Sequence, residues 1–251
     1  MSKFFPLKVA EVKRETADTV SVILDLPQEQ SADFKYKQGQ YLTFKIKIGN
    51  EEVRRSYSLC SSPYSGEKMR VAVKEVNKGK ASTFFNRELK SGDVLETMPP
   101  AGSFFTELNS ANKKHYVSFA AGSGITPVMS ILKSVLLLEP QSRFTLVYGN
   151  KNADSVIFRE ELEKLRSESD GRLNIVQVWS RQDTGNSKLN GRLNKNITDY
   201  VLQQYDLNKA DEFFLCGPEE MIKNVSDTLK EKNIAKEKIH FELFTTPVIM
   251  M

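Results

Sequence analysis

The sequence predicts a two-domain protein, in which an antiparallel β-barrel is followed by a doubly wound α/β domain. Up to about residue 110, short segments rich in β-branched and aromatic residues are separated by turn residues. This spacing is typical of an antiparallel barrel or sandwich. After residue 112, apolar strand patterns alternate with helical patterns, as they do around a parallel sheet. The polar segment 108–114 lies at the change, so we predict domains at 1–109 and 110–251.

The first domain is expected to contain six strands and one helix. The strands are expected at 7–15, 19–27, 40–48, 54–60, 69–76 and 93–99, and the helix at 81–89. Several of these strands alternate apolar and polar side chains, which indicates one buried face. Turn-forming residues such as Gly39, Gly66 and the pair Gly49-Asn50 separate them.

The second domain is expected to contain five buried strands and four helices. The strands are expected at 115–121, 144–150, 173–180, 212–217 and 239–244, and the helices at 127–138, 155–168, 195–205 and 218–232. The strands are apolar enough to be parallel strands that are buried on both faces. Because such sheets bind ligands beyond the carboxyl ends of their strands, functional residues are expected at those ends.

Composition narrows the class of function. The 251 residues carry a net charge of +4, which argues against a dedicated nucleic-acid binder but suits an anionic ligand or an acidic partner. The apolar run 128–138 is broken by Lys133 and Ser134, and the first residues contain no signal-peptide core. We therefore expect a cytoplasmic protein without membrane insertion. Two cysteines are too few for a disulfide framework or a metal cluster, and no metal site is predicted.

The first strand of the second domain ends in a glycine turn, "AAGSGITPVMSIL" at 120–132. Gly122 and Gly124 would let a phosphate approach the backbone. Thr126 is expected to cap the following helix, and Pro127 suits its first position. A helix that begins at such a turn is an anion site. We favour phosphate binding over the alternative, a purely structural turn.

The next strand ends favour NADPH over NADH. The second strand ends in "YGNKN", and no carboxylate that could hold the ribose hydroxyls follows before Asp154. The third strand ends in "WSRQD", which contains Ser180 and Arg181, and Lys188 and Arg192 follow. A group of cations suits the extra phosphate of NADPH, although a solvated basic loop is the alternative interpretation.

The fourth strand ends in "FLCGPEEM" at 214–221. A lone cysteine in a strand is usually a small buried hydrophobe, and neither His115 nor His240 is its neighbour in the sequence. We therefore do not expect Cys216 to act as a nucleophile. Close packing beside a flat ring is the more economical role for it.

Four segments in their order resemble signature segments of the ferredoxin–NADP reductase superfamily: "RRSYSLCSSP", "AAGSGITPVMSIL", "WSRQD" and "FLCGPEEMI". The resemblance extends from the first strand to "HFELFTTP" at 240–247. Within the superfamily, the chain resembles the reductase components of phenylacetyl-CoA epoxidase and similar bacterial oxygenases. The resemblance implies a flavoprotein that takes a hydride from NADPH onto FAD and passes single electrons to a ferredoxin-type iron–sulfur acceptor.

The resemblance also implies the roles of individual residues. Tyr57 would stack on the flavin, Arg55 would neutralise the FAD pyrophosphate, and Ser58 would hydrogen-bond the reactive edge. The residues implied in FAD binding are Arg55, Ser56, Tyr57, Ser58, Val73, Lys74, Lys80, Ala81, Ser82, Thr126 and Phe241. Those implied in NADP binding are Gly122, Gly124, Thr126, Pro127, Ser180, Arg181, Lys188, Arg192, Cys216, Gly217 and Pro218. Ser58, Cys216 and Glu242 are the catalytic candidates. Lys80 departs from the family pattern, because a second glycine is common at that position.

The oxygenase reductases that the chain resembles continue into a plant-type [2Fe–2S] domain with four cluster cysteines, which this sequence lacks. We expect either a fragment, or a ferredoxin or flavodoxin reductase that meets a separate acidic carrier. A monomer is expected. A flavin-binding electron-transfer protein without nicotinamide activity is an alternative, and a non-enzymatic binding module a poorer one. FMN in place of FAD stays open.

Overall fold

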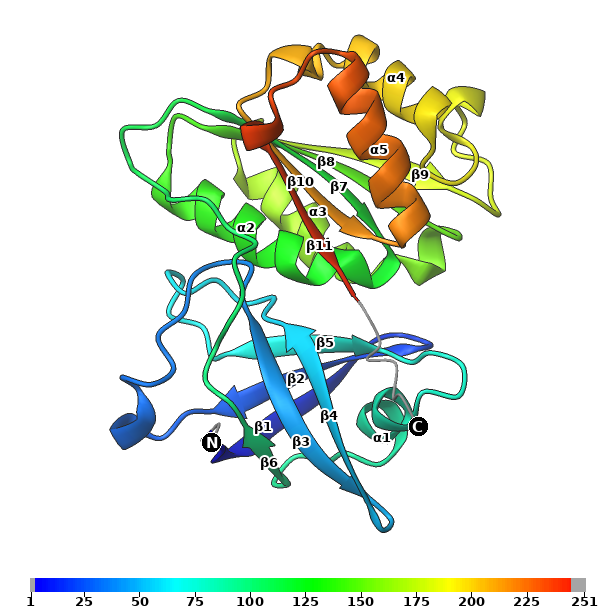
Figure 1. Ribbon diagram of the computed structural model, residues 1–251. Coiled ribbons are helices and arrows are strands. Elements are labelled where there is room, and N and C mark those ends of the chain that lie inside the picture. The colour runs from blue at the N-terminus through cyan, green and yellow to red at the C-terminus, as the bar shows by residue number, and fades with distance from the viewer. Residues whose placement is uncertain (1–2, 245–251) are drawn as a thin grey trace.

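The computed structural model describes residues 3–244, which form two domains that pack on each other. The β-barrel lies below the α/β domain in the view of Figure 1. Residues 245–247 of the C-terminal segment that resembles the superfamily lie outside the described residues. No helix in the described range is both long and apolar enough to cross a membrane.

The first domain is an antiparallel six-stranded sheet with the strand order β4-β3-β6-β1-β2-β5. Its elements are β1 (Phe5–Thr16), β2 (Thr19–Asp25), β3 (Tyr41–Ile48), β4 (Glu51–Ser58), β5 (Arg70–Lys74), β6 (Val94–Thr97) and the helix α1 (Lys80–Arg87). A bridge between Leu59 and Val71 joins the ends of the sheet, and the amide of Cys60 donates to the carbonyl of Arg70 at 2.8 Å. The sheet therefore closes into the expected barrel.

The barrel core follows the alternation of the strands. Leu42, Phe44 and Ile46 of β3 are buried, while their neighbours in the strand are partly or fully exposed. Phe85 of α1 is fully buried against this core, and its ring centroid lies 5.6 Å from that of Phe44. Helix α1 therefore covers one side of the barrel.

The second domain is a five-stranded parallel sheet with the order β11-β10-β7-β8-β9. Its strands are β7 (His115–Ala121), β8 (Arg143–Asn150), β9 (Leu173–Trp179), β10 (Glu212–Gly217) and β11 (Ile239–Leu243). Its helices are α2 (Ile125–Leu138), α3 (Arg159–Glu168), α4 (Lys195–Gln204) and α5 (Glu219–Glu231). Residues of α2 and α3 belong to the core on one face of the sheet, and residues of α4 and α5 to the core on the other. The predicted fold class is thereby confirmed.

Short 3-10 turns complete the described part of the chain: η1 (Gln28–Gln30), η2 (Gly122–Gly124), η3 (Ala153–Ser155), η4 (Ser187–Leu189), η5 (Leu207–Lys209) and η6 (Lys236–Lys238). Two of these turns shift the predicted helix boundaries. Helix α2 begins at Ile125 directly after η2, two residues before the predicted start. Helix α3 begins at Arg159 rather than 155, because Phe158 is left-handed with a φ of 63°. The turn η3 precedes α3, and a capping box formed by Asn152 and Ser155 caps the start of η3.

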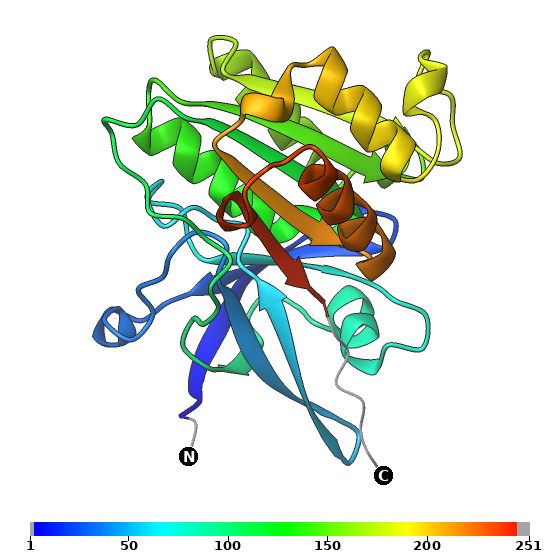
Figure 2. The ribbon, with the colours of Figure 1, turned by 45° about the horizontal axis from the view of Figure 1, so that its top comes forward.

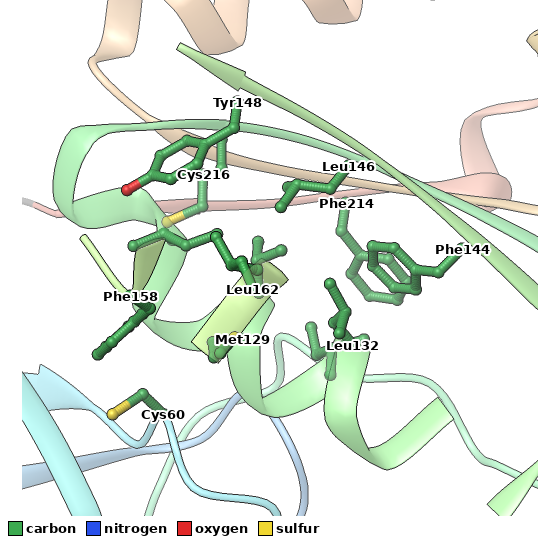
Figure 3. Packing of buried hydrophobic residues seen from close by; sticks show 14 of the residues in the cluster. Cys60, Met129, Leu132, Phe144, Leu146, Tyr148, Phe158, Leu162, Phe214 and Cys216 are labelled. Atoms are coloured by element: carbon green, nitrogen blue, oxygen red, sulfur yellow. The ribbon is translucent and has the colours of Figure 1, made fainter. Parts of the chain in front are cut away.

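The two domains meet along α2 and the strand β11. The buried core of the α/β domain continues into Cys60, Ala72 and Phe104 of the preceding segments. Figure 3 shows Cys60 approaching Met129 and Phe158 from the barrel side. Strand β11 points toward the barrel, and its end lies close to β4 in both views (Figures 1 and 2). The predicted boundary at 109/110 falls between β6 and β7 and stays a prediction.

Candidate functional site

The strand order reverses between β7 and β10, where successive strands continue to opposite sides of the sheet. Ligands of open α/β sheets bind at such a switch point. The glycine turn follows β7, and Cys216 lies near the end of β10. A Cβ atom on Gly124 would lie 2.0 Å from the Cys216 carbonyl oxygen. Only glycine allows this approach, so the turn and Cys216 form the floor of one site.

The glycine turn presents a helix start that no side chain caps. Gly124 precedes α2, and no side-chain hydrogen bond caps the helix. The predicted role of Thr126 as the N-cap is wrong, because α2 begins one residue before it, and its hydroxyl donates to the Ser123 carbonyl at 3.0 Å. Pro127 accordingly is the third residue of α2, not the first. The uncapped amides and the helix dipole favour an anion at this turn.

The end of β8 supports the turn in a way that sequence reasoning missed. The hydroxyl of Tyr148 donates to the carbonyl of Gly122 at 3.1 Å. Asn150 is 8% exposed, and its side-chain Nδ2 has no partner among the described residues. Both residues belong to "YGNKN", the segment in which the sequence has no carboxylate. An amide at the end of a buried strand was the second polar signal in that segment.

Arg55 and Tyr57 lie on one face of β4, opposite Phe44 and Leu42 of β3. The Tyr57 ring is 5.0 Å from the Phe85 ring, at an interplanar angle of 69°. Burial raises the pKa of Tyr57 to about 12. The Arg55 guanidinium donates to the Arg54 carbonyl at 2.7 Å, and no carboxylate of the described residues pairs with it. An aromatic plane beside a guanidinium fits a flat ring that carries a phosphate.

The remaining FAD candidates differ in what they offer to a ligand. Ser56 lies on the other face of β4, and its hydroxyl is 2.9 Å from that of Thr43. The Ser82 hydroxyl donates to the Gly79 carbonyl and accepts from the Val76 amide, so it holds the turn before α1. Lys80 pairs with Glu51 at 2.5 Å.

The side chains of Val73 and Ala81 are buried in the barrel core. For these two residues, only backbone groups are left for a ligand.

Lys74 connects the barrel with the glycine turn. Its Nζ atom lies 3.5 Å from a carboxylate oxygen of Asp18 and 4.0 Å from the place that a Cβ atom on Gly122 would take. Burial alone would raise the pKa of Asp18, but a hydrogen bond from Thr16 and the charge of Lys74 lower it below its ordinary value. A cation is thereby held close to the predicted phosphate site.

The three catalytic candidates come together from two domains. Cys216 and Glu242 are neighbours in the register of β10 and β11. The Ser58 hydroxyl, at the end of β4, donates to Glu242 Oε2 at 3.4 Å. Burial raises the pKa of Glu242 to about 7, which the hydrogen bond from Ser58 only partly offsets. Burial and the nearby Glu242 raise the pKa of Cys216 well above its ordinary value, so its thiol stays protonated and inert.

Three further candidates, Phe241, Gly217 and Pro218, lie close to Glu242 and Cys216 in the sequence. Phe241 precedes Glu242 in β11 and is 57% exposed. Gly217 ends β10, and Pro218 directly precedes α5. A Cβ atom on Gly217 would lie 3.2 Å from that of Ala121, so the ends of β10 and β7 pack tightly.

The candidate residues for the extra phosphate surround the end of β9. Ser180, Arg181, Lys188 and Arg192 are all exposed. The amide of Arg181 donates to the carbonyl of Lys151 at 2.8 Å. An isolated β-bridge joins Asn190 to Trp179 at the end of β9. Arg192 follows two residues after Asn190, so it also lies close to this end of the strand. The three cations therefore lie in solvent at the predicted edge of the sheet.

Family models match both halves of the chain. Residues 6–106 match the oxidoreductase FAD-binding domain, and residues 119–227 match the oxidoreductase NAD-binding domain. The residues present fit FAD, because Arg55 and Tyr57 share one face of β4, and no side chain caps the starts of α1 and α2.

The chain is 35% identical over 248 residues to a component of the 1,2-phenylacetyl-CoA epoxidase of Escherichia coli (strain K12), and the match covers 98% of this chain and 69% of that protein. It is 34% identical over 241 residues to the ferredoxin reductase component of 3-ketosteroid-9-alpha-monooxygenase from Rhodococcus rhodochrous, with coverage of 96% and 65%. The chain thus spans about two thirds of the length of these relatives.

Solved structures show the same fold. The flavohem-like FAD/NAD binding domain of nitric oxide dioxygenase from Vibrio cholerae has a TM-score of 0.82 at 24% identity, over 97% of this chain and 99% of that chain. A ferredoxin NADP+ reductase from Neisseria gonorrhoeae with bound FAD and NADP has a TM-score of 0.80 at 22% identity, over 98% and 100%. The chain belongs to the ferredoxin–NADP reductase superfamily, and it is an FAD- and nicotinamide-binding oxidoreductase related to oxygenase reductase components.

Proposed function

We propose that this protein is an NADPH-dependent flavoprotein reductase that supplies single electrons to a ferredoxin-type iron–sulfur acceptor of an oxygenase system. The observation that carries the proposal is the meeting of Ser58, Cys216 and Glu242 beside the glycine turn. Residues from both domains complete this group, as a reaction between a flavin and a nicotinamide requires. A flavin-binding module without nicotinamide chemistry would not need Cys216 and Glu242, which the α/β domain contributes.

Each residue has a separate task in this proposal. Bound FAD supplies the step from a two-electron donor to a one-electron acceptor. Tyr57 holds the plane of the ring, and Arg55 neutralises the pyrophosphate. Glu242, whose pKa burial raises to about 7, accepts the hydrogen bond of the Ser58 hydroxyl and can take up or release a proton near neutral pH. Cys216 is fully buried and keeps water from the floor of the site.

NADPH is proposed as the donor because of the exposed cations after β9. Arg181, Lys188 and Arg192 suit the 2′-phosphate, and the first carboxylate after β8, that of Asp154, is exposed in η3. The choice of a ferredoxin-type acceptor is supported by the name of the Rhodococcus rhodochrous relative, a ferredoxin reductase component.

The test is identification of the flavin, followed by turnover with both nicotinamides. The purified protein should release FAD on denaturation, and chromatography separates FAD from FMN. With ferricyanide as the electron acceptor, turnover with NADPH should have a kcat/KM at least tenfold higher than turnover with NADH. Bound flavin that neither nucleotide reduces would refute the proposal.

A further inference from the structure

Four charged side chains meet at the domain interface, away from the site described above. We call Glu67, Arg70, Lys133 and Glu161 the interdomain charge cluster. One terminal nitrogen of Arg70 donates to both carboxylate oxygens of Glu161, at 2.8 and 2.7 Å. Lys133 Nζ lies 3.0 Å from Glu161 and 2.5 Å from Glu67. Glu67 and Arg70 belong to the barrel side, whereas Lys133 and Glu161 lie in α2 and α3.

The interdomain charge cluster is largely shielded from water. The side chains of Lys133 and Arg70 are 8% and 11% exposed. Burial alone would raise the pKa of Glu161, but Arg70 and Lys133 lower it below its ordinary value, so the carboxylate stays charged. The Arg70 guanidinium also lies 5.1 Å from the centre of the Phe158 ring.

Buried ion pairs add little net stability, because desolvation offsets their attraction, but they require one geometry. The cluster is therefore better suited to fixing an orientation than to stabilising the fold.

Hydrogen bonds extend the same contact along α2. The Ser130 hydroxyl donates to the Ser61 carbonyl at 2.6 Å, and the hydroxyls of Ser134 and Ser62 are 2.8 Å apart. Positions 130, 133 and 134 share one face of a helix. That face of α2 is thus fastened to the segment 59–69, which joins β4 to β5.

The two elements joined by these hydrogen bonds, the segment 59–69 and α2, are directly connected to residues of the candidate site. The segment 59–69 begins directly after Ser58, and α2 begins directly after Gly124. Lys133 is eight residues beyond the start of α2, about 12 Å along the helix. A rotation of the α/β domain about this contact would move the glycine turn relative to Ser58. Misplacement by 1 Å can cost about 100-fold in rate.

We propose that the interdomain charge cluster is a positioning device, which holds the nicotinamide-binding domain at the angle that brings the glycine turn and Cys216 against Ser58. None of its residues is among the candidate residues for FAD or NADP binding. The inference rests on the proposed function only for its effect on flavin reduction. The fixed domain orientation itself is a property of the chain without ligands.

The first measurement is the distance between the domains in the flavin-free protein. Both native cysteines are buried, so spin labels on Val94→Cys and Leu137→Cys report one barrel position and one α2 position. These side chains are 60% and 55% exposed. Pulsed electron spin resonance should give a narrow distance distribution in the parent. Glu161→Gln should broaden it, because Arg70 loses its charged partner.

Glu163→Gln is the matched control. Glu163 lies on the same helix, but it pairs with Arg166 in solvent, with both side chains about half exposed. Its distance distribution should equal that of the parent. If Glu161→Gln gave the same distribution as Glu163→Gln, the proposal would be overturned. If Glu161→Gln did not fold, Arg70→Lys would be measured instead. It keeps the charge but loses the planar guanidinium, and an unchanged distribution in that variant would also refute the proposal.

The second measurement separates positioning from a general loss of structure. In the flavin-loaded protein, Glu161→Gln should lower the rate constant for flavin reduction at saturating NADPH at least tenfold. The apparent nucleotide affinity, the flavin content and the reoxidation by ferricyanide should stay within twofold of the parent. Equal losses in reduction and reoxidation would overturn the positioning role. A parent whose flavin no nicotinamide reduces would contradict the proposed function, while the distance measurement would still decide the orientation.

Discussion

Arg54 and Arg55 are neighbours in the sequence, but their surroundings differ. Arg54 is exposed and pairs with Glu52 at 3.1 Å. Arg55 lies on the Tyr57 face of β4, and its guanidinium donates to a backbone carbonyl. The alternation of a strand thus places one guanidinium in solvent and leaves the other beside the proposed ring site.

Arg55→Ala should weaken FAD retention by about 2 kcal/mol, a typical value for hydrogen bonds to a charged group. Tyr57→Ala should cost about 1 kcal/mol, the value of one aromatic contact. Dialysis followed by absorbance measurement of the retained flavin gives both numbers. Arg54→Ala is the matched control and should keep its flavin. Full flavin occupancy in Arg55→Ala would remove Arg55 from the site.

Glu242 should make stability depend on pH. Its pKa rises on folding from an ordinary value of 4.5 to about 7 because the carboxyl is buried. Between these values the folded protein holds a proton that the unfolded chain releases, so stability falls as the pH rises through this window. Glu242→Gln cannot ionise. In flavin-free protein, the melting temperature of the variant relative to the parent should therefore increase from pH 5 to pH 8.

The control for this titration is Glu237→Gln, because Glu237 is exposed in η6 just before β11. The melting temperature of this control relative to the parent should stay constant with pH. A constant difference for Glu242→Gln as well would show that Glu242 does not titrate in this window.

At the scale of elements, the contact between the η2 turn and β10 is the most restrictive. A Cβ atom on Gly124 would meet the carbonyl carbon and oxygen of Cys216 at 2.4 and 2.0 Å. Gly124→Ala should therefore lower the free energy of unfolding by about 3 kcal/mol, as overpacking does. Urea unfolding measures the loss. Ser123→Ala, in the same turn, should change stability by far less, and equal losses in both variants would contradict the contact.

The loop after β9 should decide the choice of nucleotide. Arg181→Ala should raise the KM for NADPH about tenfold and leave that for NADH unchanged, because only NADPH carries the 2′-phosphate. Steady-state kinetics with both nucleotides measures the change. Arg166→Ala, an exposed arginine on α3, is the control. Equal effects of Arg181→Ala on NADPH and NADH would give Arg181 a structural role.

At the scale of the whole molecule, the charge balance is relevant to the acceptor. The chain carries 36 Lys and Arg against 32 Asp and Glu. Some of these charges are paired with each other at the surface, as in Lys80–Glu51 and Lys195–Glu231. A net positive surface steers an acidic partner, and salt screens that steering.

Turnover with an acidic ferredoxin should therefore fall as salt rises, since the Debye length shrinks from about 10 Å at 0.1 M to about 3 Å at 1 M. Reduction of a neutral quinone should respond much less and serves as the control. Stopped-flow measurements at several salt concentrations test this. The same salt dependence with both acceptors would rule out electrostatic steering.

The sequence by itself determined the fold class and the glycine turn of this protein. The alternation in "QYLTFKIKI" indicates a strand with one buried face, and the apolar run "HYVSFAA" indicates a strand buried on both faces. Such patterns depend only on local periodicity, so they can be recognised in the sequence. The predicted strands and most helices accordingly agree with the structure within a few residues. The start of α2 differs from the prediction, because Thr126, which can cap a helix in principle, lies inside α2. In the structure, Gly124, which packs against the Cys216 carbonyl, occupies the N-cap position instead.

The tertiary structure alone decided which distant residues meet. Ser58 and Glu242 are 184 residues apart in the sequence, and Arg70 and Glu161 are 91 residues apart. Local periodicity carries no information about such pairs, because they depend on how one domain docks on the other. Ser58 and Glu242 could be named in advance through resemblance to a family. The interdomain charge cluster could not, since isolated charged residues in a sequence usually indicate solvated surface.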